Sequence, residues 1–193
     1  MYRDGQGVVQ DYAKARKWYE QAAAQRDADA QYNLGVMYSN GQGVAQDYAK
    51  AREWFEKAAA QGYAQAQYNL GTMYDAGQGV AQDDAKARKW YEQAAAQGDA
   101  KAQYNLGVMY SAGRGVAQDY AKAREWFEKA ATQGLAAAQY NLGLMYEYGQ
   151  GVTKDLLKAR QLYEKAAAQT ENAENTEAVR QARQALERMR GKR

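Results

Sequence analysis

Residues able to act as nucleophiles, bases or soft metal ligands are scarce in this chain. Its 193 residues include no histidine and no cysteine, and its serines are Ser39 and Ser111. The usual nucleophile–base pairs therefore cannot be assembled, and neither disulfides nor thiolate metal sites can form. A mechanism that relies on lysine or on a carboxylate stays open, but we expect no enzyme, no metal ion and no cofactor.

The polar residues that recur follow a strict repeat. The pattern Ala-x-Ala-Gln-Tyr-Asn-Leu-Gly-x-Met-Tyr begins at four positions, each 36 residues after the last: Ala28, Ala64, Ala100 and Ala136. A tryptophan and a Gly-x-Gly pair keep the same step, at Trp18, Trp54, Trp90 and Trp126, and from Gly5, Gly41, Gly77, Gly113 and Gly149. A period of this length with two helical segments predicts a solenoid, whose units bury their apolar faces against their neighbours. Function is then expected on a surface rather than in a single pocket.

One repeat is predicted to contain a helix, a glycine loop and a second helix, so the fold class is all-α. Apolar residues at helical spacing predict the first helix over residues 28–39. Gly41 and Gly43 suit the turn that ends it, and Gly-Gln-Gly-Val is predicted to be a turn rather than a phosphate loop, because no strand precedes it and no Lys-Ser/Thr follows. Asp47 suits the start of the second helix, in which the rings of Trp54 and Phe55 fill the gaps between helices.

Composition agrees with a helical chain that has its own core. With 46% hydrophobic residues, 25% charged residues and no proline, the chain can bury a core of unbroken helices. No apolar run approaches the roughly 20 residues that span a bilayer, so we expect no membrane insertion. The formal net charge of +3 is too weak to indicate a polyanionic partner.

The chain starts inside a repeat, because Met1 and Tyr2 stand in the register of Met37 and Tyr38. We therefore expect an upstream segment to have been removed or lost, and any export signal with it. The compartment is left open by these residues.

The repeated motif, continued by x-x-Gly-x-Gly-Val-x-x-Asp-Tyr-x-Lys-Ala, resembles the Sel1-like repeat, a relative of the tetratricopeptide repeat, over nearly all of residues 1–168. One departure is alanine at Ala45, Ala81 and Ala117, where that family commonly has proline before Gln-Asp. The resemblance implies a right-handed α-α superhelix that binds proteins, and a bacterial protein with a periplasmic or secreted location. It also brings an alternative, the hydrolase or penicillin-binding activity proposed for cysteine-rich relatives, from which the absence of cysteine separates this chain.

Two segments are expected along the chain. Residues 1–168 form a leading half-unit and four helix pairs, and residues 169–193 form a capping helix with a basic tail. The apolar side of the capping helix would cover the open end of the solenoid: Ala178, Val179, Ala182, Ala185, Leu186 and Met189. Its cations give a second alternative, nucleic-acid binding: Arg180, Arg183, Arg188, Arg190, Lys192 and Arg193. Acidic residues among or just before them favour a solvated cap instead: Glu171, Glu174, Glu177 and Glu187.

The candidate binding site comes from comparing the copies with one another. On the first helix four positions vary between repeats and share a face with the repeated tyrosine and asparagine. By similarity to tetratricopeptide arrays, this face lines a concave groove, where tyrosine offers a large contact area at low entropy cost to a partner protein or an extended peptide. We call it the first-helix stripe, and its candidate residues are Asp29, Tyr32, Asn33, Val36, Gln65, Tyr68, Asn69, Thr72, Asp75, Lys101, Tyr104, Asn105, Val108, Tyr140, Asn141, Leu144, Glu147 and Tyr148.

Two other interpretations of the stripe stay open. Its variation is also what neutral drift on a solvated face would produce. The asparagines at Asn33 and its equivalents could grip a peptide backbone or carboxylate, as an asparagine does in a related fold, or could make a structural hydrogen bond to the adjoining loop, which we expect. No small-molecule substrate is expected.

Overall fold

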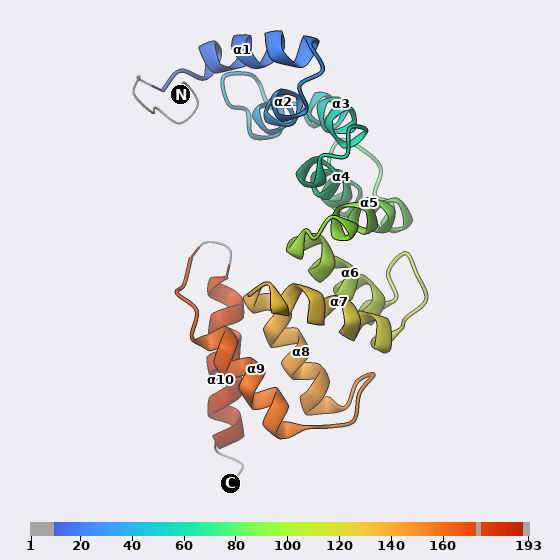
Figure 1. The fold of residues 1–193 in the computed structure, drawn as a ribbon, viewed down its shortest axis with the longest axis vertical. Coiled ribbons are helices and arrows are strands. Elements are labelled where there is room, and N and C mark those ends of the chain that lie inside the picture. The colour runs from blue at the N-terminus through green and yellow to red at the C-terminus, as the bar shows by residue number, and fades with distance from the viewer. Residues whose placement is uncertain (1–9, 173–174, 191–193) are drawn as a thin grey trace. The chain divides into compact units, whose positions relative to one another are not determined.

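The structure, a computed structural model, describes residues 10–172 and 175–190, and these residues form ten helices and no strand. The chain divides into two compact units, Met1–Gln97 and Gly98–Arg193. The first unit contains α1 (Tyr12–Ala24), α2 (Ala28–Asn40), α3 (Tyr48–Ala59), α4 (Ala64–Ala76) and α5 (Asp84–Ala96). The second contains α6 (Ala100–Ala112), α7 (Tyr120–Thr132), α8 (Ala136–Tyr148), α9 (Leu156–Ala167) and α10 (Thr176–Arg190) (Figure 1).

Within each unit the helices pack on their neighbours along the chain. The strongest packing joins the first helix of a repeat to the second, as in α2 with α3 and α8 with α9. Weaker packing joins one repeat to the next, as in α3 with α4 and α7 with α8. This is the nearest-neighbour pattern of a solenoid, and it confirms the predicted fold class of helix-turn-helix repeats.

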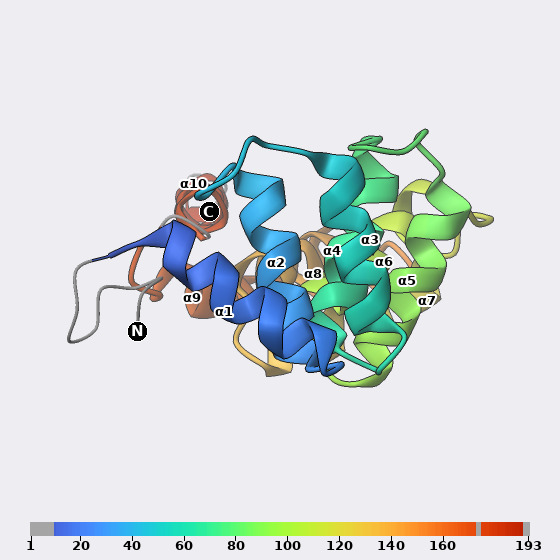
Figure 2. The same cartoon turned by 90° about the horizontal axis from the view of Figure 1, so that it is seen from above.

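The predicted helix boundaries are confirmed by the local backbone. Gly41 takes the left-handed conformation after α2, with φ of 69°, and its amide donates to the carbonyl of Met37. The Oδ1 atom of Asp47 accepts a hydrogen bond of 3.0 Å from the amide of Lys50 and so caps the start of α3. Figure 2 shows the α2–α3 and α4–α5 connections of the first unit, which begin with Gly41 and with its equivalent Gly77. The glycine pair at Gly5, the start at Met1, Glu174, Lys192 and Arg193 lie outside the described residues.

The glycine inside each first helix allows a very close approach of the second helix. A Cβ atom added to Gly107 would lie 2.6 Å from two ring carbons of Phe127, and one added to Gly143 would lie 2.5 Å from Tyr163. Gly35 meets Phe55 and Gly71 meets Tyr91 in the same way. The missing side chain of this glycine therefore lets the two helices of a repeat approach more closely than a Cβ atom would allow unless a neighbouring atom shifted.

The tryptophans take a different place from the one predicted. Phe55 is buried, but Trp54 is only half-buried, and the Nζ atom of Lys57 lies 4.0 Å from the centre of its ring. Trp18 is 62% exposed. The ring that fills the gap between helices is therefore the residue after the tryptophan. Trp54 lies at the edge of the core, and the ammonium groups of Lys57 and Lys129 lie over the rings of Trp54 and Trp126.

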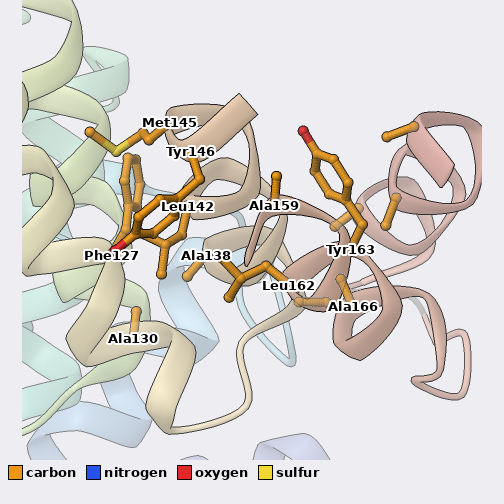
Figure 3. Packing of buried hydrophobic residues seen from close by; sticks show 14 of the residues in the cluster. Phe127, Ala130, Ala138, Leu142, Met145, Tyr146, Ala159, Leu162, Tyr163 and Ala166 are labelled. Carbon is orange, nitrogen blue, oxygen red and sulfur yellow. The ribbon is translucent and has the colours of Figure 1, made fainter. Parts of the chain in front are cut away.

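The predicted cap is present in the second unit, where α10 packs on α9 and α8 (Figure 1). It buries Ala178, Val179, Ala182 and Ala185, while Leu186 and Met189 stay partly exposed. These residues join the largest core cluster, whose side chains from α7, α8 and α9 turn toward one another in Figure 3.

Candidate functional site: the first-helix stripe

The first helices α2 and α4 enclose a hollow of about 280 Å³ on the surface of the first unit. Its walls include four predicted stripe residues, Tyr32 and Val36 from α2 and Asn69 and Thr72 from α4. Ser39, Asn40 and Gln78 add polar groups to the lining. The structure thus brings together stripe residues that every repeat keeps and stripe positions that vary.

Each repeated tyrosine of the stripe packs on an aromatic ring of the helix that follows it. The ring centres of Tyr68 and Tyr91 are 5.9 Å apart, and those of Tyr104 and Phe127 are 5.7 Å apart, in tilted arrangements. Tyr32 and Tyr140 make the equivalent pairs with Phe55 and Tyr163. One side of each tyrosine therefore belongs to the core, and the remaining, half-buried side faces the stripe.

Two of the repeated asparagines bond to a carbonyl of their own helix, whereas the structural bond predicted for them was to the adjoining loop. The Nδ2 atom of Asn33 donates to the carbonyl of Asp29 at 2.8 Å. Asn141 donates in the same way to Ala137 at 3.1 Å and also to the hydroxyl of Tyr104 at 3.2 Å. Its second bond ties α8 to α6, so the asparagine helps to connect successive first helices of the second unit.

Asp29 is joined to the next repeat through a tyrosine. The hydroxyl of Tyr63, just before α4, donates to Oδ1 of Asp29 at 2.6 Å, and the ring centre of Tyr63 lies 5.0 Å from that of Tyr32. Burial and this hydrogen bond raise the pKa of Tyr63 to about 12. At neutral pH the tyrosine therefore stays protonated and remains the donor of this hydrogen bond.

The last turn of each first helix follows a pairing rule with the ring of the second helix. Where the ring is tyrosine the partner is acidic: Tyr91 donates to Asp75 at 3.4 Å, and Tyr163 donates to Glu147 at 2.8 Å. Where the ring is phenylalanine the equivalent residue is a serine, Ser39 opposite Phe55 and Ser111 opposite Phe127. The variation at this position is therefore explained by packing within the repeat, without a ligand.

Glu147 is the most deeply placed of these acids. It is 5% exposed, and its Oε2 atom accepts from Tyr163 and, at 2.6 Å, from Arg188 of α10. Burial, followed by the hydrogen bond to Glu147, raises the pKa of Tyr163 well above its usual range. Because its carboxylate is fully engaged inside the unit, we leave Glu147 out of the proposed site.

The remaining stripe residues differ in how exposed they are. Gln65 and Lys101 are exposed in the first turns of α4 and α6. Val108 and Leu144 are half-buried and pack on the core of the second unit. Asn105 is half-buried on α6, and Tyr148, at 59% exposed, lies at the end of α8 against α9 and α10. The described stripe thus has an open polar part at the helix starts and a more apolar part along the middle.

A buried glutamine in each first helix is the polar contact that sequence reasoning missed. Gln67 is 5% exposed, its Oε1 atom accepts from Gln97 at 2.7 Å, and its Nε2 atom donates to the carbonyl of Ala59 at 3.3 Å. The same pair forms in each repeat, between residues 31 and 61, 103 and 133, and 139 and 169. A glutamine kept in every repeat directly after a buried alanine was the signal that could have revealed it.

The acidic residues, helix lengths and arginines of the described residues bear on metal, membrane and nucleic-acid binding. Within residues 10–172 and 175–190, no group of acidic residues is placed to hold a metal ion, and no helix is long and apolar enough to cross a membrane. The arginines of α10 are mostly engaged with acids, Arg180 with Glu177 and Arg183 with Glu171. Together with the Arg188–Glu147 pair, this leaves the predicted basic surface of α10 largely neutralised.

The fold and the repeat contacts define the class of this protein, an all-α repeat solenoid in which an aspartate caps the second helix of each repeat. A family model described as the Sel1 repeat matches residues 1–27, 28–63, 64–99, 100–135 and 136–170. The chain belongs to the Sel1 repeat family, whose repeats typically serve in protein–protein interactions. A search among curated proteins finds none that matches the chain.

Solved structures of bacterial proteins agree with this assignment. A protective antigen of uropathogenic Escherichia coli with the SLR fold is 37% identical, with a TM-score of 0.86 over 97% of this chain and 44% of that one. A Sel1 repeat protein from Oxalobacter formigenes is 35% identical, with a TM-score of 0.83 over all of this chain and 84% of that one. Helicobacter pylori cysteine rich protein B is 26% identical, with a TM-score of 0.54 over 69% of this chain and 97% of that one. The chain therefore spans less than half of the Escherichia coli antigen.

Proposed function

We propose that this chain is a non-catalytic scaffold that binds a partner protein or an extended peptide along the first-helix stripe. The observation that supports this most is the hollow between α2 and α4. Tyr32 and Asn69, which every repeat keeps, lie there beside Val36 and Thr72, which vary. Kept residues give a partner a regular surface to follow, and varied residues let the array discriminate between partners.

The lining of the hollow suits a polypeptide. Asn40, Asn69 and Gln78 carry side-chain amides, and each amide both donates and accepts hydrogen bonds. An extended peptide presents N–H and C=O groups in alternation, so amides can satisfy both. The half-buried ring of Tyr32 adds apolar area that is already held in place by Phe55.

The non-catalytic part of the proposal is supported by how the perturbed groups are used. Tyr63 and Tyr163 have the most strongly raised pKa values, and each hydroxyl is held by a carboxylate that joins two helices. Such contacts stabilise packing, and neither hydroxyl is poised to exchange a proton with a ligand.

The test is a comparison of bound partners between the wild-type chain and two stripe variants, each checked for folding by circular dichroism. Tyr68→Ala with Tyr104→Ala truncates two central rings. Asn40→Arg with Thr72→Arg instead fills the hollow and leaves the packing rings in place. We expect a specific partner from the source organism to be retained by the wild type and lost by both folded variants. Retention of every partner by both would refute binding along the stripe.

A further inference from the structure

The second unit carries an apolar pocket that shares no lining residue with the hollow between α2 and α4. We define this end pocket by Tyr148 of α8, Leu156 and Leu157 of α9, and Leu186 and Met189 of α10. Its volume is about 430 Å³, within the range of ligand and peptide-anchor sites. Leu156 is 50% exposed and Leu157 is 68% exposed, so the apolar floor is open to solvent.

In earlier repeats the equivalent surface is covered by the glycine loop of the next repeat. A Cβ atom on Gly79 would lie 2.7 Å from Cβ of Tyr48, the first residue of α3, and Gly151 meets Tyr120 of α7 equally closely. The residue 36 positions after Gly151 is Glu187, which lies in α10 and forms no such loop. The first turn of α9 therefore has no loop above it among the described residues.

Several residues at and near this uncovered turn are larger and more apolar, or more positively charged, than their equivalents in the other repeats. Leu157 stands where the other repeats have Ala49, Ala85 and Ala121. Tyr148 stands where they have Asn40, Ala76 and Ala112, and Lys154 where they have Gln46, Gln82 and Gln118. At this turn larger apolar side chains and a cation have therefore replaced small or neutral ones. Large apolar residues at an exposed end indicate an interaction site.

The charge around the end pocket points to the kind of partner. Three cations line it, Lys154, Arg160 and Arg190. Arg160 also pairs with Glu164, whereas Lys154 and Arg190 form no ion pair with any residue that the structure describes. The one carboxylate in the lining, Glu147, is already engaged by Arg188 and Tyr163. An apolar floor with a positive rim is complementary to apolar side chains flanked by carboxylates.

We infer that the end pocket is a docking site for a short acidic peptide segment of a partner protein, with one or two large apolar side chains as anchors. The anchors lie against Leu156, Leu157 and Met189, and aspartates or glutamates beside them meet Lys154 and Arg190. This site includes Tyr148, one of the stripe candidates, but none of the residues that line the hollow between α2 and α4, so it does not depend on binding there.

The test uses a phage-displayed random peptide library selected on the full chain. Enriched peptides should combine large apolar residues with aspartate or glutamate, and their affinity should fall as salt is raised, because exposed charges are screened. A triple variant, Tyr148→Ala, Lys154→Gln and Leu157→Ala, restores the residues of the other repeats and so keeps the fold. It should bind the selected peptides roughly tenfold or more weakly, as expected for loss of interface anchors.

The matched control is Asn40→Arg with Thr72→Arg, which alters the stripe and should leave peptide affinity unchanged. The inference is overturned if no enriched peptide binds the triple variant more weakly than the wild type, or if the peptides that do so are basic or uncharged. Peptides that only the stripe control weakens belong to the stripe and do not bear on the end pocket. Two other occupants are tested directly. Self-association of the wild type that the triple variant abolishes would assign the pocket to a second copy. Pocket-dependent binding to phosphatidylserine vesicles would assign it to a membrane surface.

Discussion

Replacement of Gly107 by alanine tests how closely the helices of a repeat approach. The added Cβ would lie 2.6 Å from Cδ1 and Cε1 of Phe127, whereas carbon atoms normally pack about 3.5–4.0 Å apart. Phe127 is 3% exposed and enclosed by the core, so its ring has no free space to enter. Overpacking of this kind costs about 1–3 kcal/mol. The better helix propensity of alanine offsets about 0.5–1 kcal/mol of that.

The expected net loss for Gly107→Ala is therefore about 0–2.5 kcal/mol, and its midpoint of about 1.2 kcal/mol corresponds to roughly 2–5 °C in melting temperature for a chain of this size. It is measured by thermal and urea unfolding, followed by far-UV circular dichroism. The control is a double-mutant cycle with Phe127→Leu, in which the smaller side chain relieves the clash. The double variant should therefore lose less stability than the sum of the losses of the two single variants. A Gly107→Ala chain as stable as the wild type, or full additivity in the cycle, would show that the close approach is not what requires glycine.

Three further predictions concern the core, the cap and the helix starts. Leu106→Ala, at a fully buried position, should cost about 2–5 kcal/mol in urea unfolding, far more than Val108→Ala on the half-buried stripe, and equal losses would contradict the core assignment. Truncation after Gln169 removes α10 and should lower the melting temperature or cause association in size-exclusion chromatography; an equally stable monomer would show that α10 is not needed as a cap. The hydrogen bonds that the capping carboxylates of Asp47 and Asp83 accept from backbone amides hold their pKa values below 3.8. Their contribution is therefore complete above that value and lost as pH falls through the lower folded-state pKa, so Asp→Asn variants should lose stability less steeply on acidification below about pH 4.

The repeat period predicted the fold well because the residues that begin and end each helix lie within the same repeat. Ala28 and Gly41 bound a first helix that the structure places within one residue of the prediction, and Asp47 caps the second helix as expected. These signals are local, since a cap or a left-handed glycine acts within a few residues of the chain. The same locality explains why the chain could be placed in its family from one motif.

The candidate site was harder to predict, because side-chain partners come from neighbouring repeats. The alternation of phenylalanine and tyrosine on second helices was visible in the sequence, but its match to serine or acid at residues 39, 75, 111 and 147 depends on which atoms meet across two helices. Tyr163 with Glu147 is an example in which apparent surface variation is internal packing. The end pocket was likewise hidden, since Leu156 and Met189 come together only when α10 folds against α9.

The central claim is that a partner protein lies along the first-helix stripe, and site-specific photo-crosslinking in the source organism tests it most directly. A benzophenone amino acid is placed at Thr72, in the hollow between α2 and α4, and in a separate chain at Gln93, an exposed position on α5 outside the hollow. The account predicts a discrete crosslinked partner from Thr72 that is absent from Gln93 and is lost when Asn40→Arg fills the hollow. Crosslinking from Gln93 with none from Thr72 would contradict it.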